Sequence, residues 1–171
     1  MKDKLYFYSK SKDALPGKGV HEVISNENEY DELKKIKDWR KILSNFYIFP
    51  IKYNNYTYNT IEHVFQAMKI NIVDSEKAYH FTIESGNIIG KGDGLIARKN
   101  RKYVKLNNEE LKEWNKIKDN VLYEASLYKF KNCEIAKNVL KFTKNAELWH
   151  IVQRSSNNER FIHLENIRAL L

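Results

Sequence analysis

The sequence predicts a mainly α-helical protein with a few short β-strands, folded as a single domain over residues 1–171. Several segments carry the apolar spacing or the capping residues of helices, whereas strand-like segments are few and short. A chain of 171 residues with 42% hydrophobic and 30% charged residues suits one globular core rather than a disordered chain. No internal repeat or low-complexity segment divides it.

The N-terminal part is expected to hold a strand, a turn and a helix. Tyr6-Phe7-Tyr8 has the aromatic character of a short strand. The loop over residues 9–19 ends in Pro16-Gly17-Lys18-Gly19, which is a strong turn signal. A charged helix is expected over residues 29–42, with three apolar residues on one side: Leu33, Ile36 and Trp39.

The clearest helix begins after Thr60, a residue type that caps helix N-termini well. The alternation in Tyr56-Thr57-Tyr58 predicts a short extended piece before it. Apolar residues then recur at the spacing of one buried helix face: Ile61, Val64, Phe65, Met68 and Ile72. A second helix is expected over residues 75–84.

The C-terminal part is predicted to be helical apart from one β-like segment, residues 148–152. Asn107 or Asn108 can cap a long helix that runs to about Lys129. Its expected apolar stripe consists of Leu111, Trp114, Ile117, Val121, Ala125 and Tyr128. A short helix capped by Asn132 should follow, with these residues inside: Ile135, Val139 and Leu140. An amphipathic helix over residues 161–171 ends the chain.

The formal net charge of +8 is unevenly distributed. Residues 91–105 hold six basic side chains against Asp93 alone, so six minus one gives five of the eight net charges. Such a run suits contact with a pyrophosphate or with nucleic-acid phosphates. The alternative is a lysine-rich, solvated surface. The six glycines fall into two clusters, which places unusual backbone conformations in two loops: Gly17 and Gly19, then Gly86, Gly90, Gly92 and Gly94.

Several classes of protein are excluded by what the sequence lacks. The single cysteine, Cys133, excludes a disulfide framework and a four-cysteine zinc site. The five histidines are scattered, and no zinc-protease, Walker or dinucleotide-binding motif occurs. No apolar signal core or membrane-length apolar run is present. We therefore expect a soluble cytoplasmic protein without a metal ion or a cofactor.

The helix after Thr60 carries a second set of residues that suggests chemistry. Glu62, Gln66 and Lys69 are spaced so that they share one face, and Glu62 lies in the first turn, where the helix dipole favours a carboxylate. An ordinary solvated face is the alternative. However, His63 and Phe65 leave little of the circumference polar, so the helix should be largely buried. A buried carboxylate needs a partner or a function.

Extended motifs resemble those of the NADAR family. The signature consists of Leu43-Ser44-Asn45-Phe46, Pro50 and the segment over residues 60–69, Thr-Ile-Glu-His-Val-Phe-Gln-Ala-Met-Lys. The family's long-helix motif is matched by Trp114, Val121, Ala125, Lys129 and Phe130. Residues 145–148 and 165–168 match its C-terminal elements. The resemblance extends over about residues 5–171 and implies a NADAR-like fold.

One branch of that family is matched in particular. Residues 7–11, residues 16–19 with Glu22, and the Gly92-Asp93-Gly94-Leu95 and Ala97-Arg98-Lys99 segments resemble bacterial, phage and large-virus members that remove ADP-ribose from guanine bases. Riboflavin-type members carry an Asp-x-x-Trp-Gly segment late in the chain, which residues 153–160 do not contain.

The resemblance therefore implies an N-glycosidase acting on ADP-ribosylated guanine in DNA or in a nucleotide. Such an enzyme would reverse a DNA ADP-ribosyltransferase toxin, as an antitoxin or as a phage anti-defence protein. Two alternatives stay open. One is an N-glycosidase that acts on ribosylaminouracil phosphates of the riboflavin pathway. The other is a non-catalytic module that binds ADP-ribose or NAD.

Cleavage of an N-glycosidic bond needs a carboxylate near the oxocarbenium ion and a proton donor near the base. Glu62 is the first candidate for the carboxylate and Glu22 the second. The resemblance implies that Lys18 attacks C1 of the ADP-ribose as a Schiff-base nucleophile, which requires an amine deprotonated by burial or nearby cations. The alternative for Lys18 is a turn lysine in solvent.

Substrate contacts are expected from both glycine clusters and from the signature segments. Ser44 and Asn45 are candidates for the ribose hydroxyls, Phe46 and Trp114 for the base or the pocket wall, and Arg98 for phosphate. A core position is an equally good interpretation for Trp114. The remaining candidates are Gly17, Gly19, Gln66, Lys69, Gly92 and Asp93.

Overall fold

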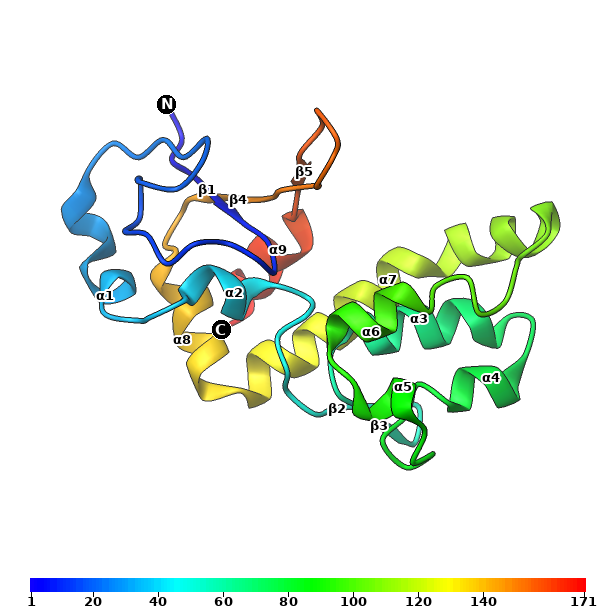
Figure 1. Ribbon diagram of the computed structural model, residues 1–171. Helices are drawn as coiled ribbons and strands as arrows, with labels where there is room; N and C mark the ends of the chain where they lie inside the picture. Colours follow the sequence, from blue (N-terminus) through cyan, green and yellow to red (C-terminus); the bar gives the residue numbers. More distant parts are fainter. The chain divides into compact units, whose positions relative to one another are not determined.

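Nine α-helices, one 3-10 helix and five short strands make up the protein, and a computed structural model describes all residues from 1 to 171. The chain divides into two units, one formed by residues 1–44 and 130–171 and the other by residues 45–129 (Figure 1). The predicted class, mainly α with a few short strands, is confirmed. That both units form a single domain stays a prediction. None of the helices combines the length and the apolar character needed to cross a bilayer.

The first unit contains a three-stranded sheet with β1 (Lys4–Phe7) and β5 (Glu159–Arg160) on either side of β4 (Glu147–His150). β1 runs parallel to β4, and β5 runs antiparallel to it. Helices α8 (Glu134–Phe142) and α9 (Ile162–Leu170) pack against each other, and α9 also contacts β4 (Figure 1). The two predicted strands and the C-terminal helix of this unit are confirmed, with ends shifted by one or two residues.

The prediction of one continuous helix over residues 29–42 is wrong. The segment forms a 3-10 turn η1 (Glu27–Tyr30), α1 (Asp31–Lys34) and α2 (Trp39–Leu43). Asp38 adopts a left-handed conformation with φ of 56°, which no residue inside an α-helix can have. The apolar spacing nevertheless identified buried residues correctly, because Leu33 and Trp39 are almost fully buried.

The predicted cap and inward face of α8 also need correction. Asn132 is the last residue of α7 (Asn108–Asn132), and Cys133 takes the N-cap position without a side-chain hydrogen bond. Ile135 is 43% exposed rather than inside, because the buried face of the helix is formed by Ala136, Val139 and Leu140. Val139 and Leu140 are fully buried, as predicted.

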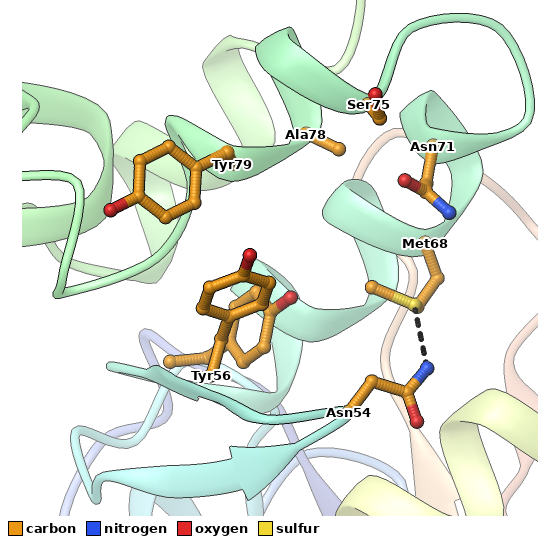
Figure 2. Close-up of a pocket in the computed structure, with 8 residues that line it drawn as sticks. Asn54, Tyr56, Met68, Asn71, Ser75, Ala78 and Tyr79 are labelled. Atoms are coloured by element: carbon orange, nitrogen blue, oxygen red, sulfur yellow. Dashed lines mark hydrogen bonds between the residues drawn. The ribbon is translucent and has the colours of Figure 1, made fainter.

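The second unit is built around α3. Its elements are β2 (Ile51–Tyr53), β3 (Tyr56–Tyr58), α3 (Ile61–Asn71), α4 (Ser75–Tyr79), α5 (Ile88–Lys91), α6 (Gly94–Lys99) and most of α7. β2 and β3 form a hairpin whose turn residues, Asn54 and Asn55, both have positive φ, as this tight turn requires. The Asn54 amide reaches from the turn toward the sulfur of Met68 on α3 (Figure 2).

One predicted boundary in this unit differs from the structure, and another agrees with it. α4 ends at Tyr79 instead of residue 84, because the Thr82 hydroxyl donates to the Tyr79 carbonyl and accepts from the Ser85 amide, which forms a turn. α7 begins where expected: Asn107 accepts from the Glu110 amide at 2.9 Å, and Glu110 accepts in return from the Asn107 amide at 2.7 Å.

The stripe of α7 is only partly buried. Trp114, Val121 and Ala125 are in the core, whereas Leu111 and Ile117 are 38% and 43% exposed. Helices α5 and α6 were not expected, since the glycine cluster around them suggested a loop.

Candidate active site

The start of α3 is fixed by a buried hydrogen-bond chain. The Thr60 hydroxyl accepts from the His63 amide at 3.2 Å and lies 2.8 Å from His63 Nδ1, while His63 Nε2 lies 2.9 Å from the Ile89 carbonyl. Because a carbonyl can only accept, Nε2 carries the proton and Nδ1 accepts from Thr60. Burial lowers the pKa of His63, so the ring is neutral and holds the helix start in place.

Glu62 occupies the first turn of this helix and is only 7% exposed. Its amide donates to the Asn45 carbonyl at 3.1 Å, and its Oε1 accepts from Gln66 Nε2 at 2.9 Å. Burial raises the pKa of Glu62, and the hydrogen bond from Gln66 and the positive charges of Arg98 and Arg101 oppose that rise. The expected burial of this carboxylate and its shared face with Gln66 are confirmed.

Two residues that are hydrogen-bonded to Glu62 each have a side-chain amide oxygen without a hydrogen-bond partner. Asn45 Oδ1 and Gln66 Oε1 are both buried and unpaired. Buried polar atoms are almost always paired, and each unpaired one costs about 1–3 kcal/mol. One of these residues is bonded to the Glu62 backbone and the other to its side chain. The cluster of Glu62, Gln66 and Asn45 therefore has two acceptor oxygens that a hydrogen-bond donor can pair with.

The second glycine cluster positions α6 beside α3. Asp93 caps α6 by accepting from the Ile96 amide at 2.9 Å, and the Gly92 carbonyl accepts from Asn59 Nδ2 at 2.9 Å. A Cβ on Gly94 would lie 2.6 Å from the Cα and Cγ of Phe46, so only glycine permits this packing. Gly92 and Asp93, which were expected to contact substrate, hold the helix that carries Arg98.

Three other candidates are also placed by the fold. Trp114 is 4% exposed and packs edge-on against Phe65 with ring centroids 4.8 Å apart, which makes it a core residue. Lys69 is half-buried and follows Gln66 by one turn of α3. Ser44 is buried and forms the C-cap of α2 in the first unit.

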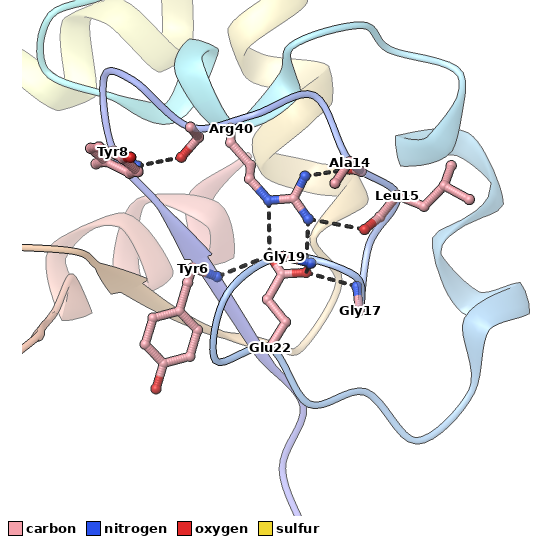
Figure 3. A network of polar contacts seen from close by, with 9 residues as sticks. Tyr6, Tyr8, Ala14, Leu15, Gly17, Gly19, Glu22 and Arg40 are labelled. Carbon is pink, nitrogen blue, oxygen red and sulfur yellow. Dashed lines mark hydrogen bonds and ion pairs between the residues drawn. The ribbon is translucent and has the colours of Figure 1, made fainter.

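The first glycine cluster is organised around the carboxylate of Glu22 (Figure 3). Its side chain is fully buried and accepts hydrogen bonds from the amides of Tyr6, Gly17 and Gly19 at 3.2, 2.8 and 3.1 Å. Arg40 Nε and Nη2 donate to the two carboxylate oxygens at 2.9 and 2.8 Å. Both oxygens of Glu22 are thus occupied, so its geometry suits holding the loop rather than reacting with a substrate.

Arg40 connects this carboxylate to the rest of the loop. The guanidinium donates to the Leu15 carbonyl at 3.0 Å and also to the Ala14 carbonyl, and it is 3% exposed. Gly17 has φ of 83°, and a Cβ on Gly19 would lie 2.7 Å from the Glu22 carboxylate. The loop therefore needs both glycines for its shape. Arg40 was missed because no pattern links it to a loop about twenty residues earlier.

Lys18 lies between these glycines but is not enclosed. Its Nζ pairs with Glu27 Oε1 at 2.9 Å, and the side chain is 60% exposed. The structure thus shows an exposed lysine beside a carboxylate, which is the alternative that the sequence left open. To act as a nucleophile, Lys18 must first separate from Glu27.

The comparisons with known proteins agree with this fold. The chain matches the family model described as NADAR domain over residues 27–160, which includes the whole second unit but not the loop with Lys18 and Glu22. The NMR structure of the E. coli protein YbiA has a similar fold, with a TM-score of 0.59, 20% sequence identity and 77% of each chain covered. No curated protein matches the chain. Since the family model spans well over half of the sequence, the protein belongs to the NADAR domain family.

Proposed function

We propose that this protein is an N-glycosidase that removes ADP-ribose from ADP-ribosylated guanine bases in DNA. The observation that carries the proposal is the buried carboxylate of Glu62, which accepts a hydrogen bond from Gln66 and whose backbone amide donates to Asn45, two residues with unpaired amide oxygens. Membership of the NADAR domain family, which includes N-glycosidases, supports the type of reaction. The PGKG and GDGL-ARK segments of the sequence support the substrate.

Glu62 is proposed to stabilise the charge that develops during bond cleavage. The bond between C1 of the ribose and the base nitrogen breaks, its electron pair goes to the base, and positive charge builds up on C1. An ionised Glu62 close to C1 stabilises that charge strongly, because its side chain is largely buried and its charge is therefore poorly screened. The base nitrogen takes up a proton, and water supplies the oxygen that binds to C1.

The unpaired oxygens indicate what the substrate must present. Asn45 Oδ1 and Gln66 Oε1 can only accept hydrogen bonds, so they fit hydroxyl groups of a ribose or N–H groups of a guanine edge. The positive charges of Arg98 and Arg101, which act on Glu62, also suit the pyrophosphate of ADP-ribose.

The substrate is tested with an oligonucleotide that carries ADP-ribose on guanine N2. Incubation with the protein should remove the modification, so that the mass of the strand returns to that of the unmodified oligonucleotide. A Glu62→Gln variant serves as the control, because it should leave the modification in place. Intact modified DNA together with hydrolysis of a ribosylaminouracil phosphate would assign the protein to the riboflavin type instead. Binding of ADP-ribose without any hydrolysis would indicate a binding module.

Lys18 is proposed to trap the ring-opened sugar. Its amine adds to the aldehyde carbon C1 and water leaves, which forms an imine. Breaking the exposed ion pair with Glu27 costs about 0–1 kcal/mol, and the ammonium must also give up a proton before its nitrogen can attack C1. Borohydride added during turnover should reduce the imine to a stable adduct on Lys18. The adduct should be absent in Lys18→Ala and present in Lys12→Ala, an exposed lysine of the same loop. An undiminished adduct in Lys18→Ala would place the nucleophile elsewhere.

A further inference from the structure

The second unit contains a pocket that none of the proposed chemistry uses. It has a volume of about 280 Å³ and is bounded by the hairpin, α3 and α4 (Figure 2). Its lining residues are Asn54, Tyr56, Tyr58, Met68, Asn71, Ser75, Ala78 and Tyr79. This volume is close to the lower end of the range for ligand pockets, about 300 Å³, so the pocket suits a ring-sized group rather than a whole dinucleotide.

The pocket lies on a different side of α3 from Glu62. At about 100° of rotation per residue, Met68 and Asn71 are turned roughly 120° and 180° away from Glu62 around the helix. Gln66 lies on the Glu62 side, as its hydrogen bond to that residue shows. The pocket is therefore a second site and not an extension of the glycosidase site.

Exposed aromatic rings form one wall of the pocket. Tyr56 and Tyr79 are 42% and 38% exposed, and their rings meet edge to face with centroids 5.3 Å apart. Figure 2 shows Tyr79 on α4 and Tyr56 on the hairpin, with Met68 and Asn71 on the other side of the view. Rings this close leave no space for a cation between them, so an ammonium-binding cage is not formed. Because more than a third of each tyrosine is exposed, the rings can instead stack on a planar group.

The polar residues of the pocket can form hydrogen bonds with the edge of a planar ring. None of the lining residues is charged, whereas Asn54, Asn71 and Ser75 supply amide and hydroxyl groups. The Asn54 amide contacts the sulfur of Met68 at 3.8 Å, which is a weak interaction that a better acceptor can replace. A ligand is thus recognised by stacking and by neutral hydrogen bonds, not by an ion pair.

We propose that this pocket binds an unpaired nucleobase of a single-stranded nucleic acid. A nucleobase is planar, neutral and ring-sized, and it carries hydrogen-bond donors and acceptors on its edge. Stacking of bases on tyrosine is the usual way in which proteins bind single strands. The formal net charge of +8 attracts such a strand over a distance. The inference does not depend on hydrolysis of ADP-ribose.

The test measures binding of a short, unmodified, fluorescently labelled DNA strand by anisotropy at fixed salt. Tyr79→Ala should weaken binding by about fivefold or more, as expected for the loss of one stacked base, while Tyr79→Phe keeps the ring and should bind as the wild type does. A strand of equal length without bases should bind more weakly to the wild type, and Tyr79→Ala should not change its affinity.

Tyr103→Ala provides the matched control. This tyrosine is similarly exposed, at 36%, and packs beside His80 without lining the pocket. Its loss should leave the affinity for the strand unchanged. Competition by free nucleosides would show that the base alone is sufficient, and competition by strands alone would show that the backbone contributes. Equal binding of the base-containing strand by wild type and Tyr79→Ala, or equal binding of the two strands by wild type, would overturn the proposal.

Discussion

Replacement of Glu62 by glutamine should reduce hydrolysis of the ADP-ribosylated strand by about a hundred- to thousand-fold, the usual range for loss of one group that stabilises charge in the transition state. Glutamine has the same size and can still accept a hydrogen bond from Gln66, so the side-chain packing is kept. What is lost is the negative charge that stabilises the developing oxocarbenium ion. The rate of removal of the modification, followed by mass, measures this effect.

The same substitution should make the protein more stable at neutral pH. Burial raises the pKa of Glu62 above the usual value of a glutamate, so the folded protein favours the protonated form more than the unfolded chain does. The stabilisation from this preference is complete at pH values below the unfolded pKa and is lost as pH rises through the raised pKa of the folded state. Each pKa unit of the shift corresponds to about 1.4 kcal/mol.

Glutamine is neutral at every pH, so the Glu62→Gln variant does not lose stability as pH rises through the raised pKa of Glu62. The Tm of Glu62→Gln should therefore exceed that of the wild type by about 2–4 °C for each kcal/mol gained at neutral pH. The difference should shrink as pH falls through the raised pKa. Glu109→Gln is the control, because its side chain is 81% exposed and its ion pair with Lys112 contributes about 0–1 kcal/mol, so activity should be unchanged and the Tm should not rise. Full activity of Glu62→Gln would contradict the catalytic role, and a lower Tm at neutral pH would contradict the effect of burial.

The position of Glu62 could be predicted because helical periodicity is a local property. Thr60 marks the start of α3, and the four-residue spacing then places Gln66 beside Glu62, as the structure confirms. The burial of Glu62 could also be predicted, because few residues around the circumference of α3 are polar. The unpaired oxygen of Asn45 could not be predicted, because it depends on where the segment before the hairpin lies in three dimensions.

The features that could not be predicted from the sequence depend on backbone conformation or on partners that are far apart in the sequence. The break at Asp38 comes from a left-handed residue inside an otherwise helical pattern, and no glycine or proline marks it. The early end of α4 comes from side-chain hydrogen bonds of Thr82 that compete with the helix. Glu22 was the second candidate for the carboxylate because it lies just beyond the first glycine loop, and its partner Arg40, 18 residues away, could not be predicted from the sequence.

The clamp formed by Glu22 and Arg40 should be essential for the stability of the first unit. Arg40→Met removes a guanidinium that is bonded to both carboxylate oxygens and to the carbonyls of Ala14 and Leu15. The carboxylate then stays buried without its counter-ion, which costs about 3–5 kcal/mol of unfolding free energy. For a chain of this size the Tm should fall by roughly 6–20 °C. Thermal and urea unfolding measure both quantities.

Two comparisons separate the charge from simple loss of packing. Glu22→Gln combined with Arg40→Met removes both charges, so it should recover part of the stability that Arg40→Met alone loses. Lys35→Met breaks an ion pair with Glu32 whose side chains are 69% and 53% exposed, and it should cost less than about 1 kcal/mol. A cost of that small size for Arg40→Met would show that the amides of Tyr6, Gly17 and Gly19 are sufficient to hold Glu22. A large cost together with loss of the borohydride adduct would instead show that the clamp presents Lys18, since the lysine itself is unchanged in this variant.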